Sequence, residues 1–494
     1  MKKFYITTSI PYVNANPHIG HALEFVQADV LARYHRAKKE DVFFLTGADE
    51  NSLKNVQAAE EQGISTRELV DANTSKFIEL TRALNISNDE FIRTVEERHF
   101  LGAQKLWSLC KKEDIYKKKY KGLYCVGCEQ FYTQKELVDG KCPEHSNSLE
   151  EVEEENYFFK LSNYQKELEK IISSNEYEIV PETKKNEVVS FIKMGLEDFS
   201  ISRSKKRAKD WGVPVPGDSQ QIMYVWFDAL ANYLTALDFG GDEKKFKKYW
   251  PADIHVVGKG IIRFHAVYWT AMLLSAGIKL PKKLFVHGYI TIDGAKMSKS
   301  LGNVIDPNEF AKKYGTDPVR YYLLRYIHPV QDSDFSIKKF EDAYTADLAN
   351  GLGNLVSRVA GLIEQNNITI KQKINKTKNQ DLHIVSPSRG GEDRGGRSKE
   401  IEKYLNKFQF DQALKFIWEK ITELDVYVSH NEPWALAKQG KIKEFTEVLE
   451  KSAHGIFEVA KLLEVFLPET SKNIQKIFLQ EKIKKGAPLF PKIN

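Results

Sequence analysis

The sequence has few cysteines and no long apolar run. Only 4 cysteines occur in 494 residues, too few for the disulfide framework of a small secreted protein. No apolar run approaches the roughly 20 residues that cross a bilayer, so we expect no membrane span. A strand-like run begins at Phe4, which leaves no room for a signal or transit peptide. We therefore expect a protein of the reducing cytoplasm.

Strong charge of one sign is also lacking. Lysine and arginine number 73 against 68 acidic residues, a net charge of +5. That mild bias is compatible with a nucleic-acid partner but does not require one. The hydrophobic content of 42% is ordinary for a globular protein, and 494 residues predict several domains.

The most informative motif is His18-Ile19-Gly20-His21, which lies between a strand-like run at 4–8 and an amphipathic stretch at 22–38. A strand, turn and helix in this order aim backbone N–H groups and a helix dipole at a phosphate. Gly20 lets a flat base approach the backbone, and both histidines can donate to phosphate oxygens. Taken alone, two such histidines are more often a surface pair or a core pair.

A second motif, Lys296-Met297-Ser298-Lys299-Ser300, places two ammonium groups in a polar loop flanked by glycines. Lysine is a flexible point-charge ligand for phosphate. Taken alone, such a pair is usually a solvated face. The two motifs together, in this order and far apart, predict two rims of one ATP site.

Three cysteines and a histidine form two half-sites, Cys125/Cys128 and Cys142/His145. This spacing predicts one closed, tetrahedral structural zinc site per chain. A catalytic zinc is disfavoured because four protein ligands leave no open position. The alternative is a set of buried thiols beside an incidental histidine. However, the segment 117–141 has too few apolar residues to form a core, so its fold would need a bound metal ion to hold it. The fourth cysteine, Cys110, lies in an apolar helical stretch and is interpreted as core.

The two ATP motifs resemble those of the class I aminoacyl-tRNA synthetases, and further strings narrow the resemblance to the methionyl-tRNA synthetase family over essentially the whole chain. These strings are Thr8-Ser9-Ile10-Pro11-Tyr12, Thr46-Gly47-Ala48-Asp49-Glu50-Asn51, His287-Gly288-Tyr289 and the segments 210–216, 225–230 and 315–322. The single zinc knuckle is similar to that of the one-zinc bacterial and organellar branch.

The resemblance implies that ATP, with Mg²⁺, activates methionine to methionyl-adenylate and releases pyrophosphate. Methionine then passes to the 3′ end of initiator and elongator tRNA(Met). The implied ATP-binding residues are His18, Gly20, His21, Glu24, Gly258, Lys296 and Lys299. Of these, His18, His21, Lys296 and Lys299 would stabilise charge on the phosphates.

The resemblance also implies a methionine pocket, in which Asp49 holds the ammonium group. The other residues of this pocket are Ile10, Tyr12, Trp226, Ala229, Leu230, Tyr233 and His265. Aromatic walls suit a polarizable thioether. The alternative is that Trp226 and Tyr233, seven residues apart, form an ordinary helix or core stripe.

For the anticodon CAU, the resemblance points to Asn354, Arg358 and Trp434. The alternatives are that Trp434 is core and that Arg358 is a surface ion-pair partner. The chain lacks the appended dimerisation domain of longer relatives, so we expect a monomer. One departure stands out: where the family has Gly-Lys-Asp, this sequence has Gly258-Lys259-Gly260. Loss of that carboxylate predicts weaker binding of the ATP ribose unless a neighbour such as Glu24 replaces it.

The expected fold is α/β. A Rossmann-type parallel-sheet catalytic domain holds an inserted zinc-binding connective domain and is followed by an all-α helical-bundle anticodon-binding domain. The expected boundaries are 1–114, 115–224 for the insertion, 225–320, 321–343 for a linker, and 344–494 for the bundle. The insertion is too short for the large editing domain of the isoleucine, valine and leucine enzymes. The Gly- and Arg-rich segment 386–398 is interpreted as a flexible loop. The alternative is an RNA-binding Arg-Gly tract, which is disfavoured because Glu392 and Asp393 dilute its charge.

Three other functions fit parts of the pattern. The chain could be a cysteine- or leucine-specific class I synthetase, or an inactive relative that only binds RNA. A small-molecule nucleotidyltransferase also uses a His-x-x-His turn, but it would not need the helical C-terminal third. Amino-acid-dependent exchange between ATP and pyrophosphate separates these alternatives.

Overall fold

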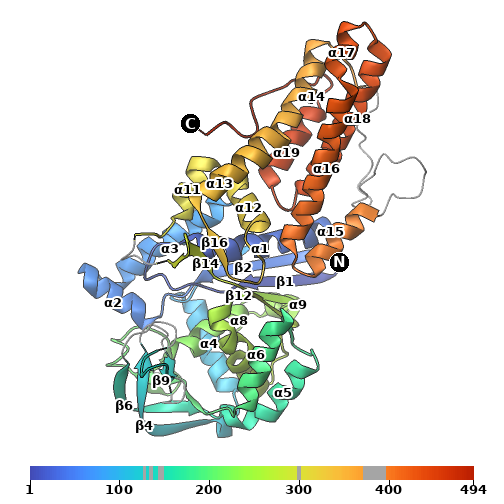
Figure 1. Cartoon of the computed structure of the whole chain (residues 1–494). Helices are drawn as coiled ribbons and strands as arrows, with labels where there is room; N and C mark the ends of the chain where they lie inside the picture. Colours follow the sequence, from blue (N-terminus) through green and yellow to red (C-terminus); the bar gives the residue numbers. More distant parts are fainter. Residues whose placement is uncertain (126–129, 133–136, 143–148, 298–301, 371–395, 494) are drawn as a thin grey trace. The chain divides into compact units, whose positions relative to one another are not determined.

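The computed structural model describes residues 1–493 except 126–129, 133–136, 143–148, 298–301 and 371–395. The chain forms two compact units (Figure 1). The first comprises residues 1–28, 40–82 and 87–287, and the second comprises 29–39, 83–86 and 288–494. Among the described residues, no helix is long and apolar enough to cross a membrane.

The first unit is built on a six-stranded sheet in which every neighbouring pair is parallel. Its strands, from edge to edge, are β3 (Glu90–Arg93), β2 (Asp41–Ala48), β1 (Lys3–Thr8), β12 (Ile254–Gly258), β13 (Lys283–His287) and β7 (Glu178–Val180). Phe4 to Thr8 are all buried, as expected for a central strand covered on both faces. The parallel sheet confirms the predicted fold class.

Strand β7 lies within the range predicted as the insertion, yet it extends this sheet at β13. The sequence signal for it is weak, because it contains only three residues. The helices of this unit include α4, α6 and α8, which lie on the same side of the sheet (Figure 1). The α-helices among the described residues of this unit are α1 (Ile19–Ala37, shared with the second unit), α2 (Leu53–Gln62), α3 (Thr66–Ala83), α4 (Glu97–Leu109), α5 (Gln165–Ser173), α6 (Glu182–Lys193), α7 (Val225–Leu230), α8 (Asn232–Thr235), α9 (Lys244–Tyr249) and α10 (Trp269–Ser275).

Two small antiparallel sheets complete the first unit. One has the order β5 (Gln130–Tyr132), β4 (Ile115–Cys125), β6 (Glu150–Phe159) and β8 (Phe199–Ser200), and the other β10 (Pro214–Val215), β11 (Asp218–Met223) and β9 (Ser202–Ser204). The lysines of β4 face the glutamates of β6, as in the pairs Lys119–Glu155 and Lys121–Glu153. Opposite charges on paired strands favour this register.

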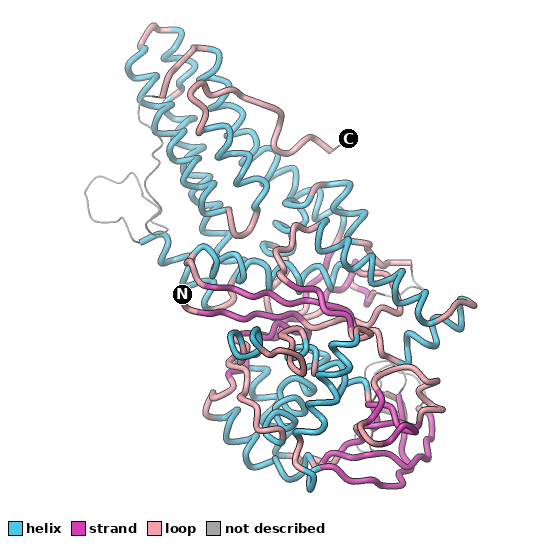
Figure 2. Tube along the Cα trace, turned by 180° about the vertical axis from the view of Figure 1, so that it is seen from behind, coloured by secondary structure: helices cyan, strands magenta, loops and turns pink. Residues whose placement is uncertain are grey.

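The second unit is mainly helical (Figure 2). Its short sheet has the order β15 (Ala295–Lys296), β14 (Ile290–Ile292) and β16 (Ser333–Phe335). Its described α-helices are α11 (Pro307–Tyr314), α12 (Thr316–Arg325), α13 (Ile337–Ala343), α14 (Asn354–Gln365), α15 (Gly396–Asn406), α16 (Phe410–Asn431), α17 (Pro433–Lys438), α18 (Ile442–Leu463) and α19 (Pro468–Phe478), and a π-helix, Tyr344–Gly353, joins α13 to α14. Helix α18 packs against α14, α16, α17 and α19.

A buried arginine joins separate parts of the second unit. Arg320 on α12 is fully buried, lies 2.7 Å from the carboxylate of Asp29, and donates to the carbonyl oxygens of Phe466 and Leu84. Guanidinium suits this position because its donors point in several fixed directions.

One sequence prediction is wrong in part. Helix α15 begins at Gly396, so the last three residues of the predicted loop 386–398 are helical. The buried residues Ile401 and Leu405 anchor this helix, and its first turn extends back over residues of low helix propensity. The rest of the predicted loop, 386–395, lies outside the described residues.

Candidate active site

The two histidines of the first motif lie at the N-terminus of α1. Their rings stack with centroids 3.8 Å apart. Nδ1 of His18 accepts from the backbone N–H of Gly20, and Nδ1 of His21 accepts from the backbone N–H of His18, each over 3.1 Å. Because each Nδ1 is an acceptor, the neutral rings carry their protons on Nε2. The short turn before α1 thus fixes both tautomers.

Burial also sets the charge of this pair. It lowers the pKa of His18 to about 4 and moves the pKa of His21 well below its usual value, with repulsion from His18 and His287 adding to the second shift. Both rings are therefore neutral near pH 7. Two neutral N–H donors at the start of a 19-residue helix suit an anionic group.

Glu24, one turn further along α1, makes contacts within the first unit. Its carboxylate accepts from the backbone N–H and hydroxyl of Ser9, over 2.7 and 2.6 Å, and lies 2.8 Å from Nε2 of His287. These contacts join α1 to the ends of β1 and β13. Sequence reasoning assigned no role to Ser9 or His287, although both follow or end strands at the carboxyl edge of the sheet.

Gly258 and Gly260 lie at the same edge. Gly258 is the last residue of β12, and Gly260 is exposed in the 3₁₀ turn Lys259–Ile261 that follows it. The position that the family fills with a carboxylate thus carries no side chain here.

Asp49 follows directly after β2 and is buried. Its backbone N–H donates to the carbonyl of Pro11 over 2.9 Å, which places it beside Tyr12. The Tyr12 ring lies edge-on to Trp226, with centroids 6.3 Å apart, and under the ammonium group of Lys54. The structure therefore brings together three residues predicted for the methionine pocket.

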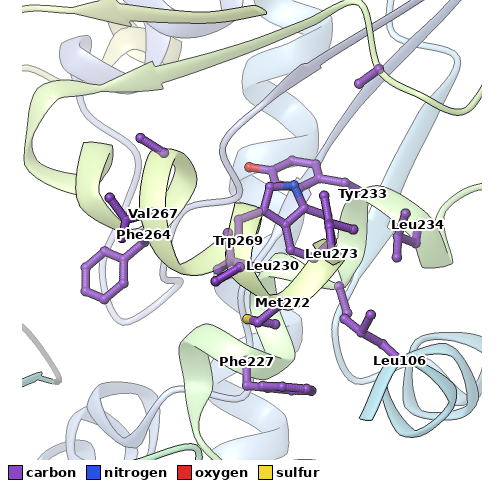
Figure 3. Close-up of a cluster of buried hydrophobic side chains, with 14 of the residues drawn as sticks. Leu106, Phe227, Leu230, Tyr233, Leu234, Phe264, Val267, Trp269, Met272 and Leu273 are labelled. Atoms are coloured by element: carbon purple, nitrogen blue, oxygen red, sulfur yellow. The ribbon is translucent and has the colours of Figure 1, made fainter. Parts of the chain in front are cut away.

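Trp226 and Tyr233 belong to separate short helices, α7 and α8, so they do not form one continuous helix. Tyr233 lies in the main apolar core and Trp226 packs against it, as the alternative of a core stripe states. Trp226 stacks flat on Phe264, with centroids 3.8 Å apart, and Phe264 is a neighbour that sequence reasoning missed. Figure 3 shows Leu230, Tyr233 and Phe264 among the buried side chains of this region. Ala229 is buried on α7, and Ile10 packs against the same core.

The Tyr233 hydroxyl lies 2.7 Å from Nε2 of His265, and Nδ1 of His265 lies 2.9 Å from the carbonyl oxygen of Ile261. A carbonyl can only accept, so Nδ1 carries the proton and the hydroxyl donates to Nε2. Burial lowers the pKa of His265 to about 4. His265 lies in the π-helical turn Phe264–Tyr268, a local irregularity that is frequent at functional sites.

Two of the predicted zinc ligands are described. Cys125 and Cys142 are both 1% exposed and belong to one small apolar cluster with Tyr132. Cys128 and His145 lie outside the described residues. Among the residues that are described, no group of three or more His, Cys, Asp or Glu side chains could hold a metal ion. Cys110 is buried as predicted, and burial raises the pKa of its thiol to about 12.

The lysine motif belongs to the second unit. Lys296 is exposed at the end of β15, paired with Thr291 of β14. The turn before it is held by the Gly294 N–H, which donates to Asp334 over 2.7 Å. Lys299 lies outside the described residues.

The predicted anticodon residues also lie in the second unit. Asn354 is exposed at the start of α14, and Trp434 on α17 is 38% exposed, so the alternative of Trp434 as core is wrong. Arg358 forms an ion pair with Asp425 over 2.5 Å, which agrees with the alternative interpretation of Arg358 as an ion-pair partner. An exposed indole remains available for stacking with a base.

The chain is similar to known proteins in sequence and in fold. The model of the family "tRNA synthetases class I (M)" matches residues 4–151 and 145–360. The chain is 40% identical to the methionine–tRNA ligase of Caldanaerobacter subterraneus, over 100% of this chain and 79% of that protein. It is also 40% identical to that of Thermotoga maritima, over 100% and 80%. A solved methionyl-tRNA synthetase of Mycobacterium tuberculosis, in complex with methionyl-adenylate, superposes with a TM-score of 0.87 at 39% identity and covers 97% of this chain and 94% of that one.

Proposed function

The chain belongs to the methionyl-tRNA synthetase family of class I tRNA synthetases, and on that premise we propose a role for each part of its site. The overall reaction is that of a methionine–tRNA ligase. Methionine attacks the α-phosphate of ATP, pyrophosphate leaves, and a ribose hydroxyl at the 3′ end of tRNA(Met) then attacks the methionyl-adenylate.

The observation that carries the ATP role is the stacked, neutral pair His18 and His21 at the start of α1. Its Nε2–H groups donate to phosphate oxygens as charge develops, and the helix N-terminus adds its dipole. Gly20 and Gly258 leave room for the nucleotide. Mg²⁺ bound to ATP would supply positive charge that neutralises the phosphates.

Lys296 and Lys299 act on the leaving pyrophosphate in this proposal. Neither provides a covalent step, so their effect is electrostatic and is largest in the transition state. Lys299→Ala should therefore lower kcat far more than it raises the KM for methionine.

For methionine, we assign the ammonium group to Asp49 and the thioether to the aromatic residues Tyr12, Trp226 and His265. The neutral state of His265 supports this role, because a charged ring beside an apolar side chain would cost desolvation energy. Tyr233 holds the His265 ring in place. Ala229, Leu230 and Ile10 complete the apolar lining.

We also propose one structural zinc ion, held by Cys125, Cys128, Cys142 and His145. The support is chemical: two thiols that are buried in one cluster have donors suited to zinc. Metal analysis of carefully purified protein should find one zinc per chain. Cys128→Ser should lower zinc content and tRNA charging while methionine activation persists, and a zinc-free active protein would remove this proposal.

The tRNA partner contacts the second unit. Asn354 and Trp434 are exposed, which suits recognition of an unpaired anticodon, in initiator and elongator tRNA(Met) alike. Arg358 would exchange its ion pair with Asp425 for a contact with the tRNA. We further propose that the protein is a cytoplasmic monomer, which sedimentation would test.

The decisive experiment is ATP–pyrophosphate exchange with each of the twenty amino acids. Methionine alone should support rapid exchange. Exchange with cysteine or leucine instead would contradict the assigned pocket, and no exchange with tRNA binding retained would identify an inactive RNA-binding relative.

A further inference from the structure

A hydrogen-bonded network of buried polar side chains lies beside the proposed methionine pocket. The roles proposed above do not explain it. His99 on α4, Asp228 on α7 and Asn51 after β2 are 0%, 1% and 7% exposed. Nε2 of His99 lies 2.5 Å from one carboxylate oxygen of Asp228, and the Asn51 amide donates to the other over 2.8 Å. Three segments that are distant in the sequence thus meet at one carboxylate.

Both ends of this network reach elements that carry pocket residues. At one end, Nδ1 of His99 lies 2.9 Å from the hydroxyl of Thr235, two residues after Tyr233 on α8. At the other end, the backbone N–H of Asn51 donates to the side chain of Asp49 over 3.3 Å. The second amide hydrogen of Asn51 donates to the carbonyl of Thr94 over 3.0 Å.

Asp228 itself lies between pocket residues. It belongs to the six-residue helix α7, which also contains Trp226, Ala229 and Leu230. So short a helix has little stability of its own, and its orientation depends on what holds it. A carboxylate fixed by two donors from α4 and from the segment after β2 supplies a specific orientation, which apolar packing alone does not.

The residue between Asp49 and Asn51 is held independently. The Glu50 carboxylate is fully buried, pairs with Arg93 over 2.6 Å and accepts from the Thr74 hydroxyl over 2.7 Å. Glu50 and Asn51 therefore fix the backbone that carries Asp49. Burying several polar groups here is costly, and the side-chain oxygen of Asn51 is buried without a hydrogen-bond partner among the described residues, so their placement next to the pocket calls for an explanation.

We propose that His99 and Asn51 are positioning residues for methionine binding. Through their hydrogen bonds to Asp228 they fix the position of α7, which carries part of the pocket wall, relative to the ammonium-binding Asp49. This inference rests on the methionine pocket proposed above. It concerns binding of the amino acid only, because the hydrogen bonds of His99, Asp228 and Asn51 lead to Thr235, Thr94 and Asp49 and not to His18 or His21. Loss of a link should therefore affect methionine and spare ATP.

The test compares substitutions that keep or remove one link. His99→Leu removes the donor to Asp228, while His99→Gln keeps an N–H in a similar position. Asn51→Asp keeps the shape but places a second carboxylate against the first. Thr81→Val is the matched control, because Thr81 is a buried threonine of the same unit whose hydroxyl bonds only to its own helix. Each variant is measured in methionine-dependent ATP–pyrophosphate exchange and in thermal unfolding.

His99→Leu and Asn51→Asp should raise the KM for methionine at least tenfold and leave the KM for ATP within twofold. His99→Gln should recover most of the loss, and Thr81→Val should change neither constant. A folded His99→Leu with a normal KM for methionine, or with equal rises in both constants, would overturn the proposal.

Two further measurements keep the result decisive. If His99→Leu does not fold, Thr235→Val, which deletes only the hydroxyl facing Nδ1, should still raise the KM for methionine about threefold while the KM for ATP stays constant. No rise in that variant would overturn the proposal as well. Failure of the proposed function is recognised separately, since the unaltered protein would then show no methionine-dependent exchange at all.

Discussion

Tyr233→Phe removes a single hydroxyl from the proposed pocket and tests how His265 is held. In the structure both side chains are buried, and the hydroxyl is the donor to Nε2 over 2.7 Å. A buried acceptor that loses its donor costs about 1–3 kcal/mol. One response of the ring would be to take up a proton at Nε2.

The free-energy cost of protonating His265 excludes this response near neutral pH. Burial holds the pKa of His265 at about 4, so protonation at pH 7 costs about 4 kcal/mol. This exceeds the loss of one hydrogen bond. The ring in Tyr233→Phe therefore stays neutral with an unsatisfied Nε2, or it rotates away from Ile261.

The expected results are a loss of about 1–3 kcal/mol in unfolding free energy and a clear rise in the KM for methionine, because the ring is no longer fixed. The pKa of His265 should also rise, since the hydroxyl that favoured the neutral form is gone. Denaturant unfolding, exchange kinetics and an NMR titration of the ring measure these three quantities.

Tyr5→Phe is the control for this change. Tyr5 is equally buried, but its hydroxyl donates to the backbone carbonyl of Tyr233 over 2.8 Å instead of to the imidazole. It should lose comparable stability and keep a KM for methionine near that of the unaltered protein. If Tyr233→Phe leaves stability and KM unchanged, the assigned donor and tautomer are wrong.

Four shorter predictions follow from other features. Tyr177→Phe should not destabilise the protein, because the Tyr177 hydroxyl is buried with no hydrogen-bond partner among the described residues; denaturant unfolding measures this. Acid should destabilise the fold: the pKa of His18 and of His265 is about 4 when folded and about 6.5 when unfolded. The unfolded chain therefore binds the protons first, and stability should fall by about 1.4 kcal/mol per histidine and pH unit between those values, as measured by unfolding at several pH values. Gly260→Asp should lower the KM for ATP by up to about tenfold, through one charge-assisted bond to the ribose, with little change for methionine; equal preference for ATP and 2′-deoxy-ATP in the variant would contradict it. Trp434→Ala should raise the KM for tRNA through lost stacking of about 1–3 kcal/mol while methionine activation is kept, and equal losses in both steps would instead indicate damage to the fold.

The strands of the sheet could be predicted because their signals are local. Apolar runs such as Phe4 to Thr8 and 254–258 become β1 and β12, since a central parallel strand is apolar on both faces. Strand β7 escaped prediction because three residues carry too little pattern and its place depends on pairing with β13. The first turn of α15 escaped because packing of Ile401 overrides the low helix propensity before it.

The residues of the candidate site also fall into two groups, those that a local motif predicts and those that it does not. Its motif residues were predicted from strings in the sequence, whereas Phe264, Ser9, His99 and Asp228 were not. Their partners lie in other elements, from 15 residues away for Ser9 and Glu24 to 129 residues away for His99 and Asp228. A single sequence has no local pattern for such a pairing, because a buried histidine or aspartate reads as an isolated polar residue until its partner is known.

The adjacency of β1 and β12 has a consequence for synthesis of the protein. The contact between Thr7 and His255 joins residues 248 positions apart, so the centre of the sheet cannot form while the chain is short. At the usual elongation rate, β1 waits about 12–50 s on the ribosome before β12 emerges. During that interval β1 and β2 expose apolar strands with unpaired edges, which are prone to aggregation. We therefore expect folding of this unit to depend on chaperones and on translation rate, and a nascent chain that ends before His255 to lack the strand β12 that pairs with β1.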